Sequence, residues 1–141
     1  MRKSLMIVFV LLLGLSSLNS LNAQRYAEDY IKSGTLSAKV GDLDQAMADF
    51  TKAIELDARV PEGFYNRGLI YLKRKEFDLA AADFAKARKL RPERADILLQ
   101  SGITAKNLGK DQEAISFIRK AIRVDSKSPE ARFNLGLIFF E

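Results

Sequence analysis

Apolar residues along most of the chain follow the spacing of amphipathic helices, and glycines interrupt these helices at one fixed interval. The segment YNRGLIY, residues 65–71, has the pattern of a helix yet places Gly68 at its centre. A glycine inside a helix costs about 1 kcal/mol relative to alanine, so another interaction must favour it. The same setting recurs every 34 residues, at Gly34, Gly68, Gly102 and Gly136. A helix-disfavouring residue that returns at one interval indicates a repeat architecture.

The glycines divide the chain into three complete units and part of a fourth. The units are residues 27–60, 61–94, 95–128 and 129–141. In each complete unit the glycine is followed by two alanines with a large apolar residue between them. These residues are Ala46, Phe50 and Ala53, then Ala80, Phe84 and Ala87, then Ala114, Ile118 and Ala121. The pattern predicts two helices per unit, with turns where glycine and acidic residues occur, at residues 40–44, 74–78 and 108–112.

We predict that each central glycine marks the place where the two helices of a unit cross. Two antiparallel helices approach closely only where small residues face each other, and Gly68 would face Ala80 at this point. Large residues such as Phe64 and Phe84 would then fill the flanks of the crossing. In this arrangement a leucine at Gly68 would force the helices apart. An alanine there would cost little, or would stabilise the helix.

The order of these positions resembles the tetratricopeptide repeat, whose pattern is W-x2-L-G-x2-Y, then A-x3-F, then P, over 34 residues. The second unit is the most similar, and its matching residues are Phe64, Gly68, Tyr71, Ala80, Phe84 and Pro92. The resemblance covers residues 27–141 and implies an all-α fold. This fold is a right-handed solenoid of helix-turn-helix repeats, with three full repeats and the first helix of a fourth. Ser33, Arg67 and Ser101 replace the usual leucine, so we expect looser packing on that side of the first helices.

Residues 1–23 precede the repeats and have the order of a secretory signal peptide. Arg2 and Lys3 come first, an apolar run over residues 5–13 follows, and serine and asparagine then lead to Ala23. A positive segment, an apolar segment and a polar segment in this order are typical of export signals. The apolar run is too short to cross the roughly 30 Å of hydrocarbon in a bilayer. We therefore predict a signal peptide over residues 1–23.

Cleavage after Ala23 would leave a repeat domain over residues 24–141 and would place the protein in the periplasm or outside the cell. Cleavage at Ser16 or Ser20 is an alternative, and so is an uncleaved segment that anchors the protein in the membrane. After cleavage we expect no stable membrane insertion. Cleavage removes two positive charges and no negative ones, so the net charge falls from +5 to +3. A charge so nearly balanced gives little support for nucleic acid binding.

The sequence lacks the side chains that most often carry catalysis or bind zinc. It contains no histidine and no cysteine, so the commonest general base and the thiolate nucleophile are missing. Asp42, Asp44 and Asp49 have the composition of a calcium loop, but Ala46 and Met47 stand where a ligand and a glycine are needed. We therefore predict that the chain is not an enzyme, and that it has no catalytic residues, no cofactor and no metal site.

Basic residues gather at the predicted C-terminal ends of two helices. They are Lys73, Arg74 and Lys75, and then Lys86, Arg88, Lys89, Arg91 and Arg94. Acidic residues are interspersed, and the helix dipole favours positive charge at a C-terminus. We therefore favour solvated helix ends over a patch for an anionic partner.

The function that this pattern favours is a non-enzymatic scaffold for protein–protein interaction. Stacked helix pairs form an extended concave surface, and the resemblance implies that the first helices there hold a peptide segment or helix of a partner. Residues four apart lie on one face of a helix. The predicted groove is lined by Ile31, Thr35, Tyr65, Asn66, Leu69, Leu99, Gln100, Ile103, Phe133 and Leu137. The alternative is the N-terminal repeat region of a larger exported enzyme or sensor whose working domain lies beyond residue 141.

Some proteins of this family hold a partner's terminal carboxylate with a clamp of Lys, Asn, Asn, Lys and Arg on successive first helices. The matching positions here are Ile31, Thr35, Asn66, Asp96 and Gln100. Only Asn66 fits, and Asp96 would repel an anion. We therefore do not expect binding of this type. The identity of the protein or peptide partner is not predicted.

The last predicted helix, residues 129–141, has no following helix to cover Leu135 and Phe139. The ends of repeat arrays need a polar outer face for solubility. We therefore expect the chain to associate with itself through this helix. We also interpret the sequence as part of a longer protein.

Overall fold

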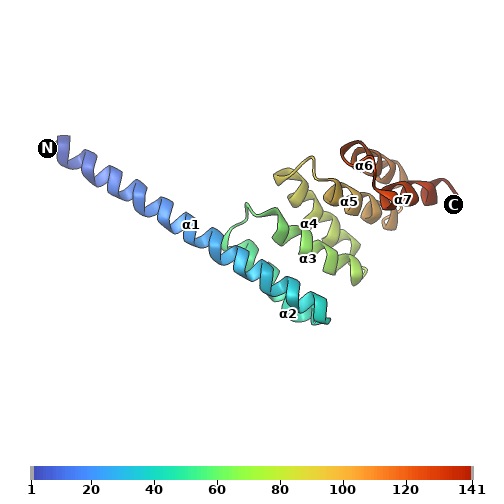
Figure 1. Ribbon diagram of the computed structural model, residues 1–141, viewed down its shortest axis with the longest axis horizontal. Coiled ribbons are helices and arrows are strands. Elements are labelled where there is room, and N and C mark those ends of the chain that lie inside the picture. The colour runs from blue at the N-terminus through green and yellow to red at the C-terminus, as the bar shows by residue number, and fades with distance from the viewer. Residues whose placement is uncertain (1, 141) are drawn as a thin grey trace.

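The computed structural model describes the backbone of residues 2–140 and the side chains of residues 18–140. The described backbone forms α-helices joined by short turns (Figure 1). The helices are α1 (Arg2–Val40), α2 (Leu43–Leu56), α3 (Pro61–Lys73), α4 (Phe77–Leu90), α5 (Ala95–Asn107), α6 (Asp111–Val124) and α7 (Pro129–Phe140). Each of the three complete units contains the end or the whole of an odd-numbered helix followed by an even-numbered one, and the partial fourth unit contains α7. The predicted all-α solenoid of helix-turn-helix repeats is therefore confirmed.

Successive helix pairs stack along the array, and the two rows of helices differ in how closely they approach. Contacts are most extensive within the pairs α1–α2, α3–α4 and α5–α6. The first helices also contact one another in the order α1, α3, α5 and α7. The backbones of α2, α4 and α6 do not approach one another in the part of the chain that the structure describes. The array therefore curves, with the first helices on its inner side. We call the inner side the concave surface and the side formed by α2, α4 and α6 the convex surface.

The core consists of separate groups of buried side chains between neighbouring helices. Phe50 of α2 packs with Ile70 of α3, and Phe64 of α3 packs with Ala87 of α4 and Ile97 of α5. A third group joins α5, α6 and α7, and its members are Leu98, Leu99, Ile118, Ala121 and Ala131. Such local packing is typical of repeat proteins, in which each repeat contacts only its neighbours.

The turns inside the repeats lie where the sequence predicts them and share one backbone conformation. Gly41, Lys75 and Gly109 occupy the same position in successive repeats and have φ angles of 88°, 61° and 71°. The next residue donates its N–H to a carbonyl near the end of the preceding helix, as Glu76 does to Tyr71 at 2.9 Å. These bonds satisfy carbonyls that a helix end leaves free. Lys75 has a β-carbon, so the left-handed conformation strains its backbone.

The central glycines face the large residue of the second helix. A β-carbon at Gly68 would lie 2.9 Å from Cε1 of Phe84, whose ring is fully buried. This contact corrects the prediction that Gly68 faces Ala80, which lies one helical turn before Phe84. The first and third repeats have the same arrangement, with Gly34 beside Phe50 and Gly102 beside Ile118. Alanine at Gly68 is therefore expected to destabilise the fold, because its β-carbon would overlap the ring.

Polar side chains that make hydrogen bonds occupy the positions where leucine is usual. Arg67 donates from Nε and Nη2 to the two carboxylate oxygens of Asp83, at 2.8 and 2.9 Å, and Asp83 is buried. Ser33 donates to Oδ2 of Asp49 at 2.7 Å, across the same interval of 16 residues. Ser101 donates to a backbone carbonyl of its own helix at 2.7 Å. Arg67 and Ser101 are therefore well packed, which corrects the expectation of loose packing in the second and third repeats, whereas Ser33 is exposed.

The N-terminal part of α1 extends away from the repeats (Figure 1). This part belongs to the predicted signal peptide over residues 1–23. The side chains of residues 1–17 lie outside the described residues, so the signal peptide stays a prediction. Within the described part of the chain, no helix is both long enough and apolar enough to span a membrane.

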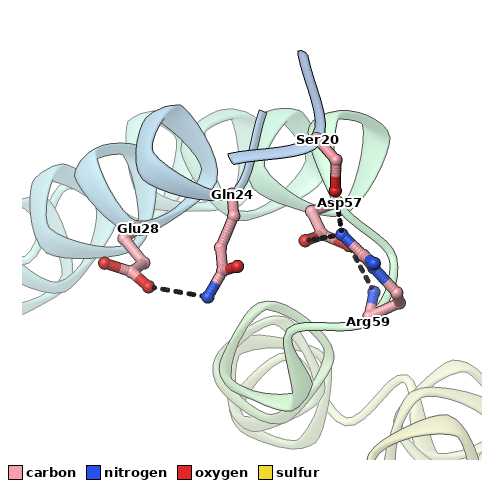
Figure 2. A network of polar contacts seen from close by, with 5 residues as sticks. All are labelled: Ser20, Gln24, Glu28, Asp57 and Arg59. Atoms are coloured by element: carbon pink, nitrogen blue, oxygen red, sulfur yellow. Dashed lines mark hydrogen bonds and ion pairs between the residues drawn. The ribbon is translucent and has the colours of Figure 1, made fainter. Parts of the chain in front are cut away.

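The turn between α2 and α3 contacts α1 inside this segment (Figure 2). Arg59 donates to Asp57 from Nε at 2.8 Å and from Nη2 at 3.0 Å, and these bonds lower the pKa of the Asp57 carboxyl. Arg59 Nη2 also donates to Ser20 Oγ at 3.2 Å. On the same face of α1, Gln24 donates to Glu28 at 3.4 Å. Removal of residues 1–23 would therefore take away the Ser20 bond and leave the Arg59–Asp57 pair in place.

Candidate peptide-binding surface

Three predicted groove residues line one pocket between α1, α2 and α3. Thr35 of α1 and Asn66 and Leu69 of α3 surround this pocket, whose volume is about 180 Å³. The other lining residues are Ala38, Leu43, Phe50, Ile70 and Lys73. The lining is mostly apolar, and Lys73 adds a cation at the end of α3. The structure brings these residues together because α1 and α3 lie next to each other on the concave surface.

The other predicted groove residues differ in how far a ligand can reach them. Four of them are partly buried, namely Ile31, Tyr65, Gln100 and Ile103. On α7, Phe133 is 66% exposed and Leu137 is 38% exposed. The concave surface therefore becomes more open and more apolar toward α7.

Leu99 is a core residue, which corrects its assignment to the groove. Its side chain is only 6% exposed and packs in the group of buried residues between α5, α6 and α7. Tyr65 occupies the equivalent position in the second repeat and is only partly buried. A residue pattern that treats all repeats alike cannot show this difference, because the burial of Leu99 depends on how α7 packs beside it.

Arg94 links two acidic residues in the first turns of α3 and α5. It precedes α5 and places Nη1 at 2.6 Å from Oε1 of Glu62 on α3. Its Nε and Nη2 donate to the two carboxylate oxygens of Asp96, at 2.9 and 2.7 Å. The hydrogen bonds from Arg94 lower the pKa of the Asp96 carboxyl, and those to Asp96 raise the pKa of Arg94. Arg94 therefore partly neutralises Glu62 and Asp96.

Tyr65 lies against this ion-pair network. The guanidinium of Arg94 is 5.2 Å from the centre of the Tyr65 ring, and the ring of Phe84 lies 6.0 Å away on the other helix of the repeat. Burial raises the pKa of the Tyr65 hydroxyl, and the charge of Asp96 raises it further. The hydroxyl therefore stays protonated at neutral pH and can donate a hydrogen bond to a ligand.

The chemistry of this surface is suited to binding rather than to a carboxylate clamp or to metal chelation. At the matching clamp positions, Asn66 lines the pocket and Asp96 is held by Arg94. The described residues contain no group of three or more side chains that is placed to hold a metal ion. The available chemistry consists of an apolar floor, an amide, a phenol and paired charges.

The sequence pattern does not indicate the position of Arg94. The pattern places Arg94 with the basic residues at the end of α4, whereas the structure places it on the concave surface with Glu62 and Asp96. Arg94 is the last residue of its unit and directly precedes α5. This position at the boundary was the available signal, because a residue there can turn toward either row of helices.

Family models match three segments of the chain. Two models described as tetratricopeptide repeat match residues 61–94 and 95–128, and a model described as TPR repeat matches residues 38–75. The two tetratricopeptide segments coincide with the second and third units defined by the glycine spacing. A search of curated protein sequences finds no match to the chain.

Solved structures of similar fold cover most of the chain. The first TPR domain of Spaghetti (RPAP3), bound to the HSP90 peptide SRMEEVD, has a TM-score of 0.81 and 24% identity, over 83% of this chain and 93% of that one. An Arabidopsis OM64 TPR domain has a TM-score of 0.79 and 21% identity, over 82% and 96% of the two chains. YrrB, described as a TPR protein with an unusual peptide-binding site, has a TM-score of 0.73 and 27% identity, over 78% and 57%. These likenesses show the fold. The repeat models jointly span residues 38–128, which is more than half of the chain, so the chain belongs to the tetratricopeptide repeat family.

Proposed function

We propose that this protein is a non-enzymatic interaction scaffold that holds a peptide segment or helix of a partner protein on its concave surface. The observation that carries the proposal is the pocket that Thr35, Asn66 and Leu69 form where α1 and α3 meet. Proteins of similar fold include a TPR domain bound to an HSP90 peptide and another bound to an HSP70 peptide. These proteins support the class of ligand, and the pocket supports its location.

The lining of the pocket favours an apolar side chain of the ligand. Leu43, Phe50 and Ile70 form an apolar surface, while Asn66 and Lys73 offer hydrogen-bond donors beside it. An amphipathic helix or an extended segment with one apolar anchor fits this arrangement. A ligand that depends on a terminal carboxylate does not, because the matching clamp positions supply the amides of Asn66 and Gln100 but no cation.

Alanine substitutions on the two surfaces test the location. A partner would first be captured with the full chain and identified. Tyr65→Ala and Leu69→Ala are expected to weaken its binding by more than about 1 kcal/mol each, as loss of central contacts does. Lys52→Ala and Lys86→Ala, on exposed positions of the convex surface, are the matched controls and should leave the affinity unchanged. Loss of binding only in the control pair would show that the concave surface is not the site.

We also propose that the protein is exported and that residues 1–23 are removed. The support is the order of charged, apolar and polar residues in this segment. N-terminal sequencing of protein recovered from the periplasm or the medium should find Gln24 as the first residue. Recovery of intact Met1 on a membrane-bound product would favour the anchor.

Self-association through α7 is a further part of the proposal. Phe133, Phe139 and Phe140 are 66%, 61% and 92% exposed, and exposed apolar groups of this kind favour association. Light scattering on residues 24–141 should show a species larger than a monomer. A monomer at high concentration would refute this part without affecting the peptide-binding proposal.

A further inference from the structure

A second groove lies on the convex surface, between the C-terminal halves of α4 and α6. Two adjoining pockets, with volumes of about 630 and 370 Å³, share Pro92, Leu98 and Lys120 as lining residues. Phe117 of α6 completes the apolar floor. The groove exists because the backbones of α4 and α6 do not approach each other, while α5 beneath them contacts both. We call this the convex groove.

The rim of the convex groove carries cations that the fold does not neutralise. They are Arg88 and Lys89 of α4 and Lys120 and Arg123 of α6. None of the four takes part in an ion pair with the side chains that the structure describes, whereas Arg67, Arg74 and Arg94 each do. Glu93 is the one carboxylate among the residues that line these two pockets. The groove is therefore strongly positive.

Arg88 of this rim stacks on an aromatic ring and pairs with no carboxylate among the described residues. Its guanidinium lies 4.1 Å from the centre of the Phe117 ring, and it makes no hydrogen bond with the described residues. Burial lowers the pKa of Arg88, and Glu113 acts in the opposite direction. A guanidinium carries five donors in a fixed plane. Stacking on Phe117 holds this plane and leaves the donors for water or for an anion.

The equivalent groove between α2 and α4 differs in its charge. One repeat earlier, Asp83 stands at the position of Phe117 and pairs with Arg67. Ile54 stands at the position of Arg88, and Glu55, at the position of Lys89, pairs with Lys52. Lys86 and Lys89 stand at the positions of Lys120 and Arg123, so the earlier groove keeps two of the four cations. The additional positive charge that Arg88 and Lys89 give to the convex groove is a local feature and does not follow from the repeat.

We propose that the convex groove binds an acidic peptide segment of a partner protein, with carboxylates at the rim and one apolar side chain on the floor. The positive rim selects negative charge, and electrostatic complementarity of this kind directs binding. The depth of the groove favours a peptide over a membrane. Leu98 on the floor is buried, so a flat bilayer surface would reach only the rim, whereas a peptide can place a side chain between the helices.

Fluorescence anisotropy with the full chain and a labelled synthetic peptide tests the proposal. The peptide has runs of glutamate on both sides of one phenylalanine. The double variant Lys120→Glu/Arg123→Glu should weaken its binding at least about tenfold, since both cations reverse sign at the rim. Both residues are exposed, so the fold should be retained, and circular dichroism melts check this.

The matched control is Lys52→Glu/Lys86→Glu. Lys52, Lys86 and Lys120 occupy the same position in successive repeats, so this double variant changes the net charge equally but does not touch the convex groove. It should leave the affinity within about a factor of two, because neither side chain lines the groove and solvent and salt screen exposed charges. A peptide with serine in place of phenylalanine should bind several-fold more weakly.

Three results would overturn the proposal. The first is that the unmodified chain does not bind the acidic peptide. The second is that both double variants lose binding equally, which would mean that the net charge of the protein alone determines binding. The third is that Lys120→Glu/Arg123→Glu leaves peptide binding intact but releases the chain from phosphatidylserine vesicles, which would make the groove a membrane contact. Because Tyr65→Ala should not affect this peptide, failure here is separate from failure of the concave site.

Discussion

The second and third repeats place different residues at one pair of positions between their helices. In the second repeat, Arg67 and Asp83 form an ion pair with two hydrogen bonds. In the third repeat the equivalent residues are Ser101 and Phe117, and Arg88 of the neighbouring repeat lies over the Phe117 ring. In the second repeat Asp83 neutralises the charge of Arg67, whereas in the third repeat Phe117 holds Arg88 without neutralising its charge.

This difference shows that a regular backbone does not imply a regular surface. The two repeats have helices of equal length and turns of the same conformation. Their charge balance differs because the side chain at position 83 or 117 decides whether a nearby arginine finds a carboxylate. Function in such an array is therefore expected where the repeats differ, while stability is expected where they agree.

Removing the carboxylate of the second repeat should have the largest effect on stability. Asp83→Ala leaves Arg67 largely buried without its partner, and breaking one side of a buried ion pair typically costs about 3 to 5 kcal/mol. We expect the lower end of this range, because Arg67 is partly exposed. Urea unfolding of the full chain measures the change. A cost below about 1 kcal/mol would mean that the pair behaves as a surface salt bridge.

Exchanging the pair for residues of the third-repeat type sharpens the same comparison. The double variant Arg67→Ser/Asp83→Phe removes both charges at once and places an aromatic ring at the position of Phe117. It should recover at least half of the stability lost in Asp83→Ala, since replacing both partners avoids an unpaired buried charge. If it is less stable than the single variant, the two repeats are not interchangeable at these positions.

The stability lost on replacing a central glycine by alanine should depend on the space available beside it in each repeat. A β-carbon at Gly102 would lie 2.5 Å from Cγ1 of Ile118 and 3.2 Å from the carbonyl oxygen of Ala114. A β-carbon at Gly68 would lie 2.9 Å from Cε1 of Phe84. We expect Gly102→Ala to cost about 2 to 3 kcal/mol and Gly68→Ala about 1 to 2 kcal/mol, as overpacking does.

Gly136→Ala is the control for this ranking. No atom lies within 4 Å of a β-carbon at Gly136, so only helix propensity acts there. This variant should stabilise α7 by up to about 1 kcal/mol. Thermal melts give all three values, and equal costs at the three glycines would contradict the account.

The turn of the second repeat should gain stability when it is made like that of the third. Lys75 has a φ of 61°, where the equivalent Gly109 has 71°. Lys75→Gly relieves the strain of a β-carbon in this conformation and should stabilise the chain by roughly 0.5 to 1 kcal/mol. A thermal melt measures this. A lower melting temperature would mean that the side chain of Lys75 contributes more than its backbone costs.

The smallest expected effect is a pH dependence at the concave edge of the third repeat. Arg94 lowers the pKa of Asp96 in the folded protein. The contribution of Asp96 to the free energy of unfolding is therefore present above the usual Asp pKa of about 3.9 and is lost as the pH falls through the lower folded pKa. Asp96→Asn should therefore cost a few tenths of a kcal/mol at pH 7, since solvent screens this partly exposed pair. Urea titrations at pH 7 and pH 2 should show a smaller difference at pH 2 than at pH 7.

Helix positions were predictable because the 34-residue interval repeats an entire helix pair. The glycines located each first helix, and the turns followed from glycine and acidic residues. The partner of Gly68 was not predictable in the same way, because Ala80 and Phe84 lie one turn apart on one face of α4. The 34-residue interval indicates which face of α4 is buried but not which residue of that face contacts the glycine.

The site was predictable only in part. Thr35, Asn66 and Leu69 meet in one pocket, since neighbouring first helices pack side by side. Leu99 is buried because α7 packs beside it, and no pattern within its own repeat indicates this. The Arg67–Asp83 pair did have a signal, because Ser33 and Asp49 show the same spacing of 16 residues, but serine and arginine were considered only as departures from leucine.

Site-specific photo-crosslinking in a cell lysate tests the central claim most directly. A photoreactive amino acid would replace Leu69 on the concave surface or, in a second variant, Lys52 on the convex surface. A partner held in the concave pocket should crosslink strongly at position 69 and not at position 52, and an excess of purified wild-type chain should compete for it. Crosslinking at position 52 with none at position 69 would contradict the account.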